Sequence, residues 1–311
     1  MILPSFFDTK KSLNLFGISE YFKFLKNLYL KGKLPNVLML SGKKGSGKST
    51  LLNHFIFSIF DKENYDDKNY ILNDHSFFYN QFINDIYPNI IYLSGTDIIN
   101  SKIESIRDLK KKLFKTSISS KPRFIILDDV ELFNTNSLNA LLKTIEEPKK
   151  NNFFFLINNK SKPLIETIQS RCLDIKLILK EEKRLEIIDL LVEKYDLNLI
   201  IDPKISKLTP GCFIKFNYIF EENKIFLNED FITSLNILLN LYKKNKAIMY
   251  IDMILFLTDN HFNNINKKNF SINERIIENR RFVFDNINKF FLYNLNQNSL
   301  LNIIHDKIND G

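Results

Sequence analysis

Residues 37–60 read VLMLSGKKGSGKSTLLNHFIFSIF and carry the strongest structural signal in the chain. They begin with a short apolar run of strand length, pass through a glycine-rich turn, and end in a segment with the apolar spacing of a helix. Residues 42–49 match the pattern G-x-x-x-x-G-K-[ST] at every fixed position, in the strand–turn–helix context that a phosphate loop requires. The alternative is a surface turn rich in Gly and Lys, and this context makes it much the weaker interpretation.

The residue types in this loop suit the binding of ATP. Glycines let the backbone curl so that its N–H groups point at phosphate oxygens, and the helix that starts near Lys48 adds the positive end of its dipole. Lys48 supplies a charge for the β- and γ-phosphates, while the Ser49 hydroxyl can ligate Mg²⁺. The candidate nucleotide-binding residues of the loop are Gly42, Lys43, Lys44, Gly45, Ser46, Gly47, Lys48, Ser49 and Thr50.

Three further apolar runs have the length of a strand, at residues 90–93, 124–127 and 153–157. None alternates apolar with polar residues, which is typical of strands buried on both faces of a parallel sheet. Helical patterns lie between the strands, so we predict a three-layer α/β domain up to about residue 177.

The predicted helices of this domain occupy residues 17–33, 103–114 and 137–147. We expect Pro35 to end the first and Pro148 the last, because proline cannot continue a helix. Residues 61–87 are polar and rich in Asn and Asp, and we predict an irregular insertion there.

A pair of carboxylates follows the strand at residues 124–127. Asp128 and Asp129 would lie at the carboxyl end of that strand, beside the phosphate loop, where Asp128 can hold Mg²⁺ through water. An Asp pair on its own would suggest a helix cap or a turn. Beside an intact phosphate loop, we favour the metal-binding role.

Composition sets the remaining limits. The chain has 311 residues and a net charge of +8, which fits two or three domains and contact with a polyanion without proving it. Cys172 and Cys212 lie 40 positions apart and the four histidines are scattered, so we expect neither a zinc site nor disulfides. Without a signal peptide or a run of about 18 apolar residues, we expect a cytoplasmic protein with no membrane contact.

Residues 127–175 resemble the AAA+ clamp-loader subunits of DNA polymerases. The motifs that carry the resemblance are Asn139-Ala140-Leu141-Leu142-Lys143, Ile145-Glu146-Glu147-Pro148 and Ser170-Arg171-Cys172. Lys31-Gly32-Lys33-Leu34-Pro35, before the phosphate loop, is similar to the delta-prime subunit of bacterial DNA polymerase III. The resemblance covers roughly residues 12–215.

This resemblance implies an architecture of three parts. An AAA+ nucleotide-binding domain, with a parallel sheet between helices, would occupy residues 1–177. A small helical lid would follow at 178–224, and an all-α collar domain for oligomerisation at 225–311. The segments after residue 180 do show helical rather than strand patterns.

The resemblance also implies site residues and partners. Such subunits form a ring that places a sliding clamp on primer–template DNA, with ATP at the interfaces between subunits. Arg171 would act in trans as an arginine finger in the ATP site of a neighbouring AAA+ subunit. Its alternative role is to complement the end of the helix just before it. Asn159 matches the polar sensor residue that follows the fourth strand.

Two departures from the hydrolysing subunits suggest a weak or absent ATPase. Those subunits carry Glu where this chain has Asp129, and a carboxylate one methylene shorter would misplace the attacking water. They also carry Arg where Thr209-Pro210-Gly211-Cys212 has Gly211. The absence of cysteine in residues 58–88 matches delta-prime subunits that lack zinc. We therefore predict a delta-prime-like subunit that binds ATP and Mg²⁺.

Three alternatives stay open at this point. The chain could be an ATP-hydrolysing motor like the gamma and tau subunits, or a stand-alone P-loop NTPase acting on nucleic acid. It could also be a structural protein with a vestigial nucleotide site.

Overall fold

The computed structural model describes residues 4–95, 121–148, 151–227, 229–268 and 274–309. The chain forms two compact units, and both are discontinuous in sequence. One consists of Met1–Leu191 with Thr209–Cys212, and the other of Val192–Leu208 with Phe213–Gly311. Within the described ranges, no helix is at once long and apolar enough to cross a membrane.

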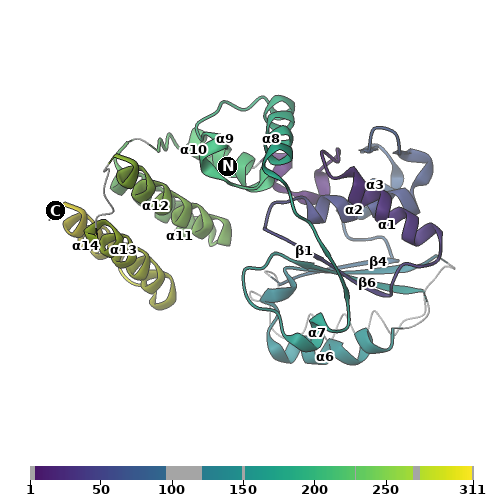
Figure 1. Ribbon diagram of the computed structural model, residues 1–311. Helices are drawn as coiled ribbons and strands as arrows, with labels where there is room; N and C mark the ends of the chain where they lie inside the picture. The colour runs from purple at the N-terminus through teal and green to yellow at the C-terminus, as the bar shows by residue number, and fades with distance from the viewer. Residues whose placement is uncertain (1–3, 96–120, 149–150, 228, 269–273, 310–311) are drawn as a thin grey trace. The chain divides into compact units, whose positions relative to one another are not determined.

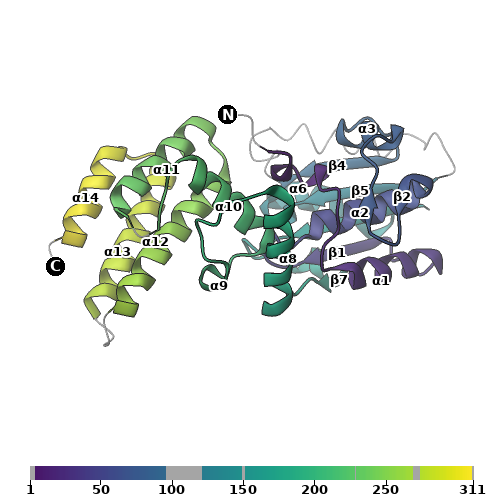
Figure 2. The ribbon, with the colours of Figure 1, turned by 90° about the horizontal axis from the view of Figure 1, so that it is seen from above.

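A parallel sheet forms the centre of the N-terminal unit (Figure 1). In the described part of the chain it has five strands in the order β4-β5-β6-β1-β7, and Figure 2 shows β4 and β7 at opposite edges. Leu38 pairs with Phe155 on one side and with Leu173 on the other. The strand bounds are β1 Val37–Ser41, β4 Ile90–Ser94, β5 Arg123–Asp128, β6 Asn152–Asn158 and β7 Leu173–Lys176. The four predicted strands are thus confirmed.

Three helices cover one face of this sheet: α1 (Ser19–Leu30), α2 (Lys48–Phe60) and α3 (Phe77–Ile83) (Figure 1). Phenylalanine rings fill the space between them and the strands. The rings of Phe55 and Phe124 stack with centroids 5.9 Å apart, and Phe155 meets Phe124 at 5.1 Å. Burial of these side chains is the main force that holds the layer together.

Two helices cover the opposite face, α6 (Thr135–Glu146) and α7 (Glu166–Gln169) (Figure 1). Leu141 and Ile145 of α6 pack with Ile168 of α7 against Met39 and Phe154 of the sheet. Successive residues of a strand point to opposite faces, so the unbroken apolar runs of β1, β5 and β6 supply both layers. The three-layer α/β prediction is confirmed.

The first helix ends earlier than predicted. We expected Pro35 to stop it, but α1 ends at Leu30 and Gly32 follows with φ +63°. The Gly32 N–H donates to the Tyr29 carbonyl (3.0 Å) and the Lys33 N–H to the Leu28 carbonyl (2.9 Å). A left-handed glycine that closes such bonds is a frequent helix terminator, so Gly32 and not Pro35 sets the boundary.

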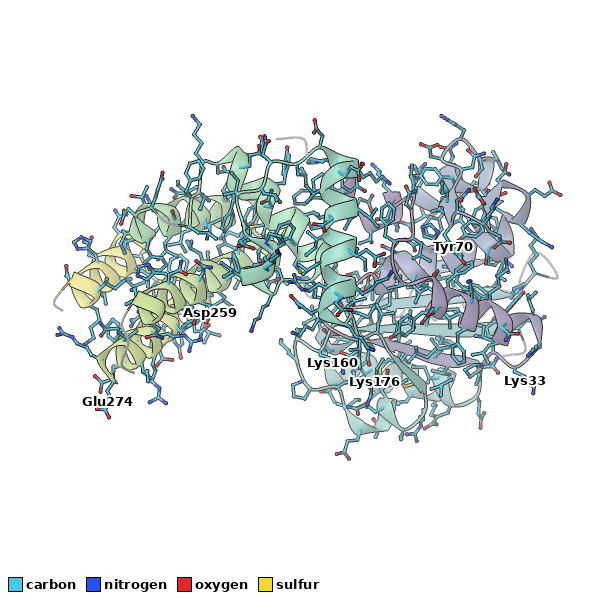
Figure 3. All side chains as sticks on the ribbon, turned by 45° about the horizontal axis from the view of Figure 1, so that its top comes forward. Lys33, Tyr70, Lys160, Lys176, Asp259 and Glu274 are labelled. Carbon is cyan, nitrogen blue, oxygen red and sulfur yellow. The ribbon has the colours of Figure 1, made fainter. Side chains whose placement is uncertain are left out.

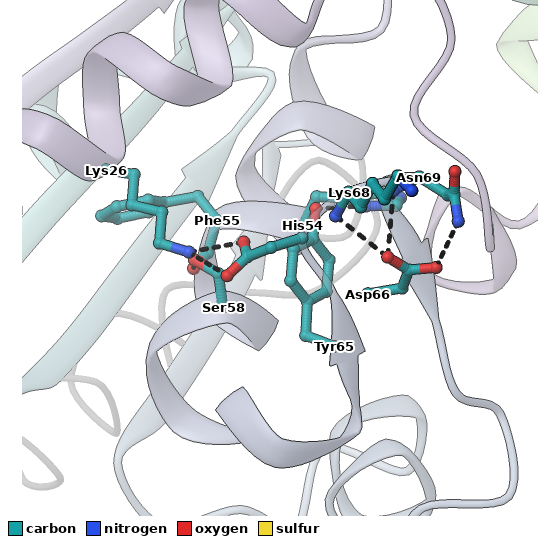
Figure 4. Close-up of polar contacts among 9 residues, drawn as sticks. Lys26, His54, Phe55, Ser58, Tyr65, Asp66, Lys68 and Asn69 are labelled. Carbon is teal, nitrogen blue, oxygen red and sulfur yellow. Dashed lines mark hydrogen bonds and ion pairs between the residues drawn. The ribbon is translucent and has the colours of Figure 1, made fainter.

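The prediction of an irregular insertion at residues 61–87 is wrong. The segment holds η3 (Lys62–Asn64), a small hairpin of β2 (Tyr65–Asp66) and β3 (Ile71–Leu72), and α3. His54 of α2 contacts the Tyr65 hydroxyl through Nδ1 (3.2 Å), and Asp66 accepts bonds from the turn that follows it (Figure 4). Several of its aromatic side chains are buried: Tyr65, Phe78, Tyr79 and Phe82.

The predicted helix at residues 103–114 lies outside the described residues. Shorter elements of the N-terminal unit are the 3-10 helices η1 Ser5–Phe7, η2 Thr9–Lys11 and η4 Val130–Leu132. Helix α8 (Glu181–Tyr195) begins in this unit and ends in the other.

The C-terminal unit is helical wherever the structure describes regular elements. Leu238, Ile254, Val283 and Ile304, one from each of its last four helices, are buried. The helix bounds are α9 Pro203–Ser206, α10 Pro210–Glu222, α11 Phe231–Asn245, α12 Ile248–Lys268, α13 Glu274–Tyr293 and α14 Gln297–Asn309. The start of α10, up to Cys212, belongs to the N-terminal unit. The predicted division of the chain at residues 177 and 224 stays a prediction.

Candidate nucleotide-binding site

The candidate site begins with the loop between β1 and α2. Its backbone needs glycine at Gly47, the residue before α2, which has φ +96° and would strain any side chain. The loop is closed by its own hydrogen bonds, since the Ser46 N–H donates to the Lys43 carbonyl (3.3 Å). Lys43 and Lys44 are exposed, whereas Ser46 and Lys48 are buried.

Lys48 points its ammonium into this loop. Nζ donates to the carbonyls of Gly42 (2.7 Å) and Lys43 (2.8 Å) and lies 3.4 Å from Ser46 Oγ. Only 3% of the residue is exposed, and burial lowers the pKa of Lys48 from 10.5 to about 8. The negative charges of Asp128, Glu131 and Asp129 act against that shift.

The carboxylate of Asp128 lies next to the first turn of α2. Its Oδ2 accepts a hydrogen bond from the Ser49 hydroxyl (3.4 Å) and a shorter one from the Tyr92 hydroxyl (2.5 Å). Its Oδ1 accepts from the Asp129 N–H (2.9 Å). Burial raises the pKa of Asp128, and these hydrogen bonds oppose the change.

These oxygens fit a magnesium ion. Mg²⁺ prefers oxygen ligands and is commonly held by one or two carboxylates together with substrate phosphates. The Asp128 carboxylate is an oxygen ligand of this kind, and the Ser49 hydroxyl provides a second oxygen beside it. Ser49, and not Thr50, is the residue whose hydroxyl bonds to Asp128. Across the residues that the structure describes, no three His, Cys, Asp or Glu side chains gather to hold a metal ion by themselves. The role of Ser49 and Asp128 as ligands stays a prediction.

Asp129 is bound by the predicted sensor residue. Asn159 donates from Nδ2 to Asp129 Oδ1 (2.6 Å), and Asp129 itself has a left-handed backbone with φ +50°. Burial, followed by the charge of Asp128, raises the pKa of Asp129. The structure therefore brings Asp129 and Asn159 together at the carboxyl edge of the sheet.

Glu131 has a different task. Its carboxylate accepts hydrogen bonds from the N–H groups of Asn159 (3.1 Å) and Ser161 (3.2 Å) and from the Ser161 hydroxyl (2.8 Å). It is buried and holds the turn that follows β6. A carboxylate committed to three donors is poorly placed to polarise a water molecule.

Further basic side chains lie at this edge of the sheet. Lys160 follows β6 and Lys176 ends β7, and both are exposed (Figure 3). Because the five described strands of this sheet are parallel, these lysines share the edge where the phosphate loop begins.

Arg171 makes its contacts elsewhere, in the turn after α7. Its Nη2 lies 2.6 Å from Glu146 Oε1, and its Nη1 donates to the Thr167 carbonyl (2.7 Å). The second contact is the helix-end role that we weighed as the alternative. The side chain is still 36% exposed, so it is not enclosed by its own subunit.

Two contacts of this site were not predicted from the sequence. The first is Tyr92, whose only signal was a hydroxyl at the end of a side chain in an otherwise apolar strand. The second comes from Thr209–Cys212, a segment in which the sequence draws attention only to the Arg that it lacks. Thr209 Oγ1 donates to the Lys44 carbonyl (2.5 Å) and the Gly211 N–H to the Gly45 carbonyl (2.9 Å).

The parallel sheet between helices, with the phosphate loop at the end of β1, defines a P-loop nucleotide-binding domain. A family model described as DNA polymerase III, delta subunit, matches residues 17–180, more than half of the chain. The chain belongs to that family.

Named relatives agree with the family. The chain is 40% identical over 82 residues to the DNA polymerase III subunit delta′ of Buchnera aphidicola subsp. Acyrthosiphon pisum, covering 26% of this chain and 25% of the relative. It is 29% identical over 156 residues to the subunit gamma of the same organism, covering 49% and 41%. Against the subunit delta′ of Bacillus subtilis, identity is 25% over 234 residues, covering 74% and 67%. The matches thus span a quarter and about two fifths of the first two relatives.

Among solved structures, the chain is similar to a DNA polymerase III gamma subunit-related protein from Thermotoga maritima. Its TM-score is 0.46 at 14% identity, covering 92% of this chain and 99% of that chain. The assignment of the fold rests on the sheet and loop described above.

Proposed function

We propose that the chain is a delta-prime-like subunit of a bacterial clamp loader, one that binds MgATP but hydrolyses it weakly or not at all. In this role it works in the cytoplasm with other AAA+ subunits, and meets the sliding clamp and primer–template DNA through the assembled complex. The likeness to delta′ and gamma subunits of DNA polymerase III supports the placement in that complex.

The observation that carries the proposal is a complete phosphate loop beside Asp129, whose side chain is shorter than that of Glu and whose carboxylate already accepts a hydrogen bond from Asn159. Asp129 stands where the resemblance expects the longer Glu, and Asn159 holds its Oδ1 at 2.6 Å. A base displaced by about an ångström costs roughly a hundredfold in rate. Glu131 does not replace it, because its carboxylate holds Asn159 and Ser161.

The nucleotide would be held by groups already in place. Loop N–H groups and Lys48 would meet the phosphates, and Ser49 and Asp128 would hold Mg²⁺, which neutralises phosphate charge when bound. The Lys48 ammonium would give up its hydrogen bonds to the Gly42 and Lys43 carbonyls and donate to phosphate oxygens instead. The buried positive charge would then be paired with a negative one.

Arg171 would complete a neighbour's site in trans. For that it must leave Glu146, and a half-exposed ion pair of this kind is worth only about 0–1 kcal/mol. Release therefore costs little beside the transition-state stabilisation that an arginine finger supplies, about a thousandfold in rate or more.

The test compares ATP turnover by the isolated chain with turnover by the reconstituted loader. We expect the chain alone to be nearly inactive, and Arg171→Ala to reduce turnover at the affected site about a thousandfold or more. Arg171→Lys should fall almost as far, since lysine lacks the planar fork. Arg280→Ala is the matched control, because Arg280 is also half-exposed and paired with a carboxylate, Asp259.

Rapid turnover by the chain alone would favour the motor role instead, which the likeness to gamma subunits keeps as the second candidate. Full activity of the loader that carries Arg171→Ala would refute the finger assignment.

A further inference from the structure

The crest of the phosphate loop is covered by a segment from 165 positions further along the chain. We call Thr209–Cys212 the clasp. The Thr209 hydroxyl donates to the Lys44 carbonyl (2.5 Å), and Cys212 Sγ lies 3.5 Å from the same oxygen. The Gly211 N–H donates to the Gly45 carbonyl (2.9 Å). Two successive carbonyls of the loop are therefore held from one side.

The clasp and the loop approach each other closely at two glycines, Gly45 and Gly211. A Cβ on Gly45 would lie 2.6 Å from Thr209 Oγ1 and 2.7 Å from the Cys212 nitrogen. A Cβ on Gly211 would lie 3.0 Å from the Gly45 carbonyl oxygen. Gly45 also has φ +76°, which few other residues adopt. Gly45 is thus needed for the two backbones to meet, whereas a side chain on Gly211 would crowd the Gly45 carbonyl and push the backbones apart by a few tenths of an ångström.

Holding these carbonyls fixes the direction of the amides that follow them. In a trans peptide the C=O and the next N–H point in opposite directions. With the Lys44 and Gly45 carbonyls turned to the clasp, the N–H groups of Gly45 and Ser46 point away from it. The Ser46 N–H does lie inside the loop, because it donates to the Lys43 carbonyl, which also accepts from Lys48.

We propose that the clasp holds the loop amides in the direction needed to bind the phosphates of a nucleotide, and that Thr209 is a positioning residue for that site. The hydrolysing subunits that the chain resembles carry an Arg at the position of Gly211, which would reach the phosphates directly. In this chain, hydrogen bonds from the clasp to the loop backbone take the place of that Arg. The inference rests on the proposed function in one respect, the identity of the ligand as a nucleoside triphosphate.

The test uses the full chain and a fluorescent ATP analogue with Mg²⁺. Thr209→Val keeps the shape of the side chain and removes its hydroxyl. Loss of one hydrogen bond that orders the loop should weaken binding roughly 3- to 10-fold. Thr209→Ser restores the hydroxyl and should bind within about twofold of the wild type. Thr258→Val is the matched control. The Thr258 hydroxyl also donates to a backbone carbonyl, that of Ile254, but both residues belong to the C-terminal unit and not to the unit that holds the phosphate loop.

A second measurement separates positioning from general stability. Amide hydrogen exchange in the chain without nucleotide should become faster at residues 43–46 in Thr209→Val, while exchange in β5 and β6 stays unchanged. Wild-type affinity in Thr209→Val, or equally weak binding by Thr209→Ser, would overturn the inference.

The outcomes also separate this inference from the proposed function. Rapid ATP turnover by the chain would refute the weak-hydrolysis role but leave the ratio of affinities, and so the clasp, intact. A wild-type chain that binds no ATP analogue would refute both the nucleotide-binding part of the proposed function and the role of Thr209.

Discussion

Lys48 gives the most quantitative prediction, because its ammonium is buried in the phosphate loop of the nucleotide-free chain. We consider the free energy of unfolding of the nucleotide-free chain between pH 7 and 10.5, for the wild type and for Lys48→Met. Burial lowers the pKa of Lys48 to about 8 in the folded chain, against 10.5 for an exposed lysine.

The direction of the effect follows from proton counting. Between pH 8 and 10.5 the unfolded chain keeps a proton on Lys48 that the folded chain has lost, so stability rises with pH. Below pH 8 both states are protonated and the slope disappears. A difference of about 2.5 pKa units corresponds to about 3 kcal/mol. Wild-type stability, measured relative to Lys48→Met, should therefore increase by about that amount across the interval.

Urea unfolding followed by circular dichroism measures this difference directly. Groups common to both proteins, such as the buried tyrosines, cancel in the comparison. Lys43→Met removes an exposed lysine from the same loop and controls for the change in net charge. A difference between wild type and Lys48→Met that stays flat or falls from pH 8 to 10.5 would show that burial does not dominate at this lysine.

Three further predictions concern stability and can be checked by urea unfolding at pH 7. Glu131→Gln should cost about 1–3 kcal/mol, because an amide cannot accept all the hydrogen bonds from Asn159 and Ser161, and an unchanged midpoint would contradict it. Tyr92→Phe should also cost about 1–3 kcal/mol, since it leaves buried Asp128 without its shortest hydrogen bond; a loss below 0.5 kcal/mol, on the order of an average surface change, would refute this. Gly17→Ala should lower the free energy of unfolding more than Gly32→Ala does. The two glycines have similar φ (+69° and +63°), but only a Cβ on Gly17 would meet a neighbour, Ile187 Cδ1 at 2.5 Å. Equal losses would mean that Ile187 moves aside freely.

Much of the fold could be predicted because its signals are local. The apolar runs of β1, β5 and β6 are unbroken, and residues 42–49 match the phosphate-loop pattern at every fixed position. From the rule that parallel strands end at one edge, the nearness of Asp128 to Ser49 also followed. The structure places those two side chains 3.4 Å apart.

The features that could not be predicted depend on distant partners. The Tyr92 hydroxyl and the Thr209 hydroxyl bond to residues 36 and 165 positions away, and no local pattern marks either contact. The polar composition of residues 61–87 hid a different signal. Phe78 and Phe82 are four positions apart and lie on one face of α3, where they pack against Phe57 of α2.

The discontinuous path of the N-terminal unit has a practical consequence for dissecting this protein. A fragment that ends between residues 191 and 208 would contain every strand of the sheet and the whole glycine-rich turn, yet it would leave the carbonyls of Lys44 and Gly45 to bulk water. Affinities measured on such a fragment would describe a slacker loop than that of the intact chain. Only a fragment that extends past Cys212 keeps the clasp.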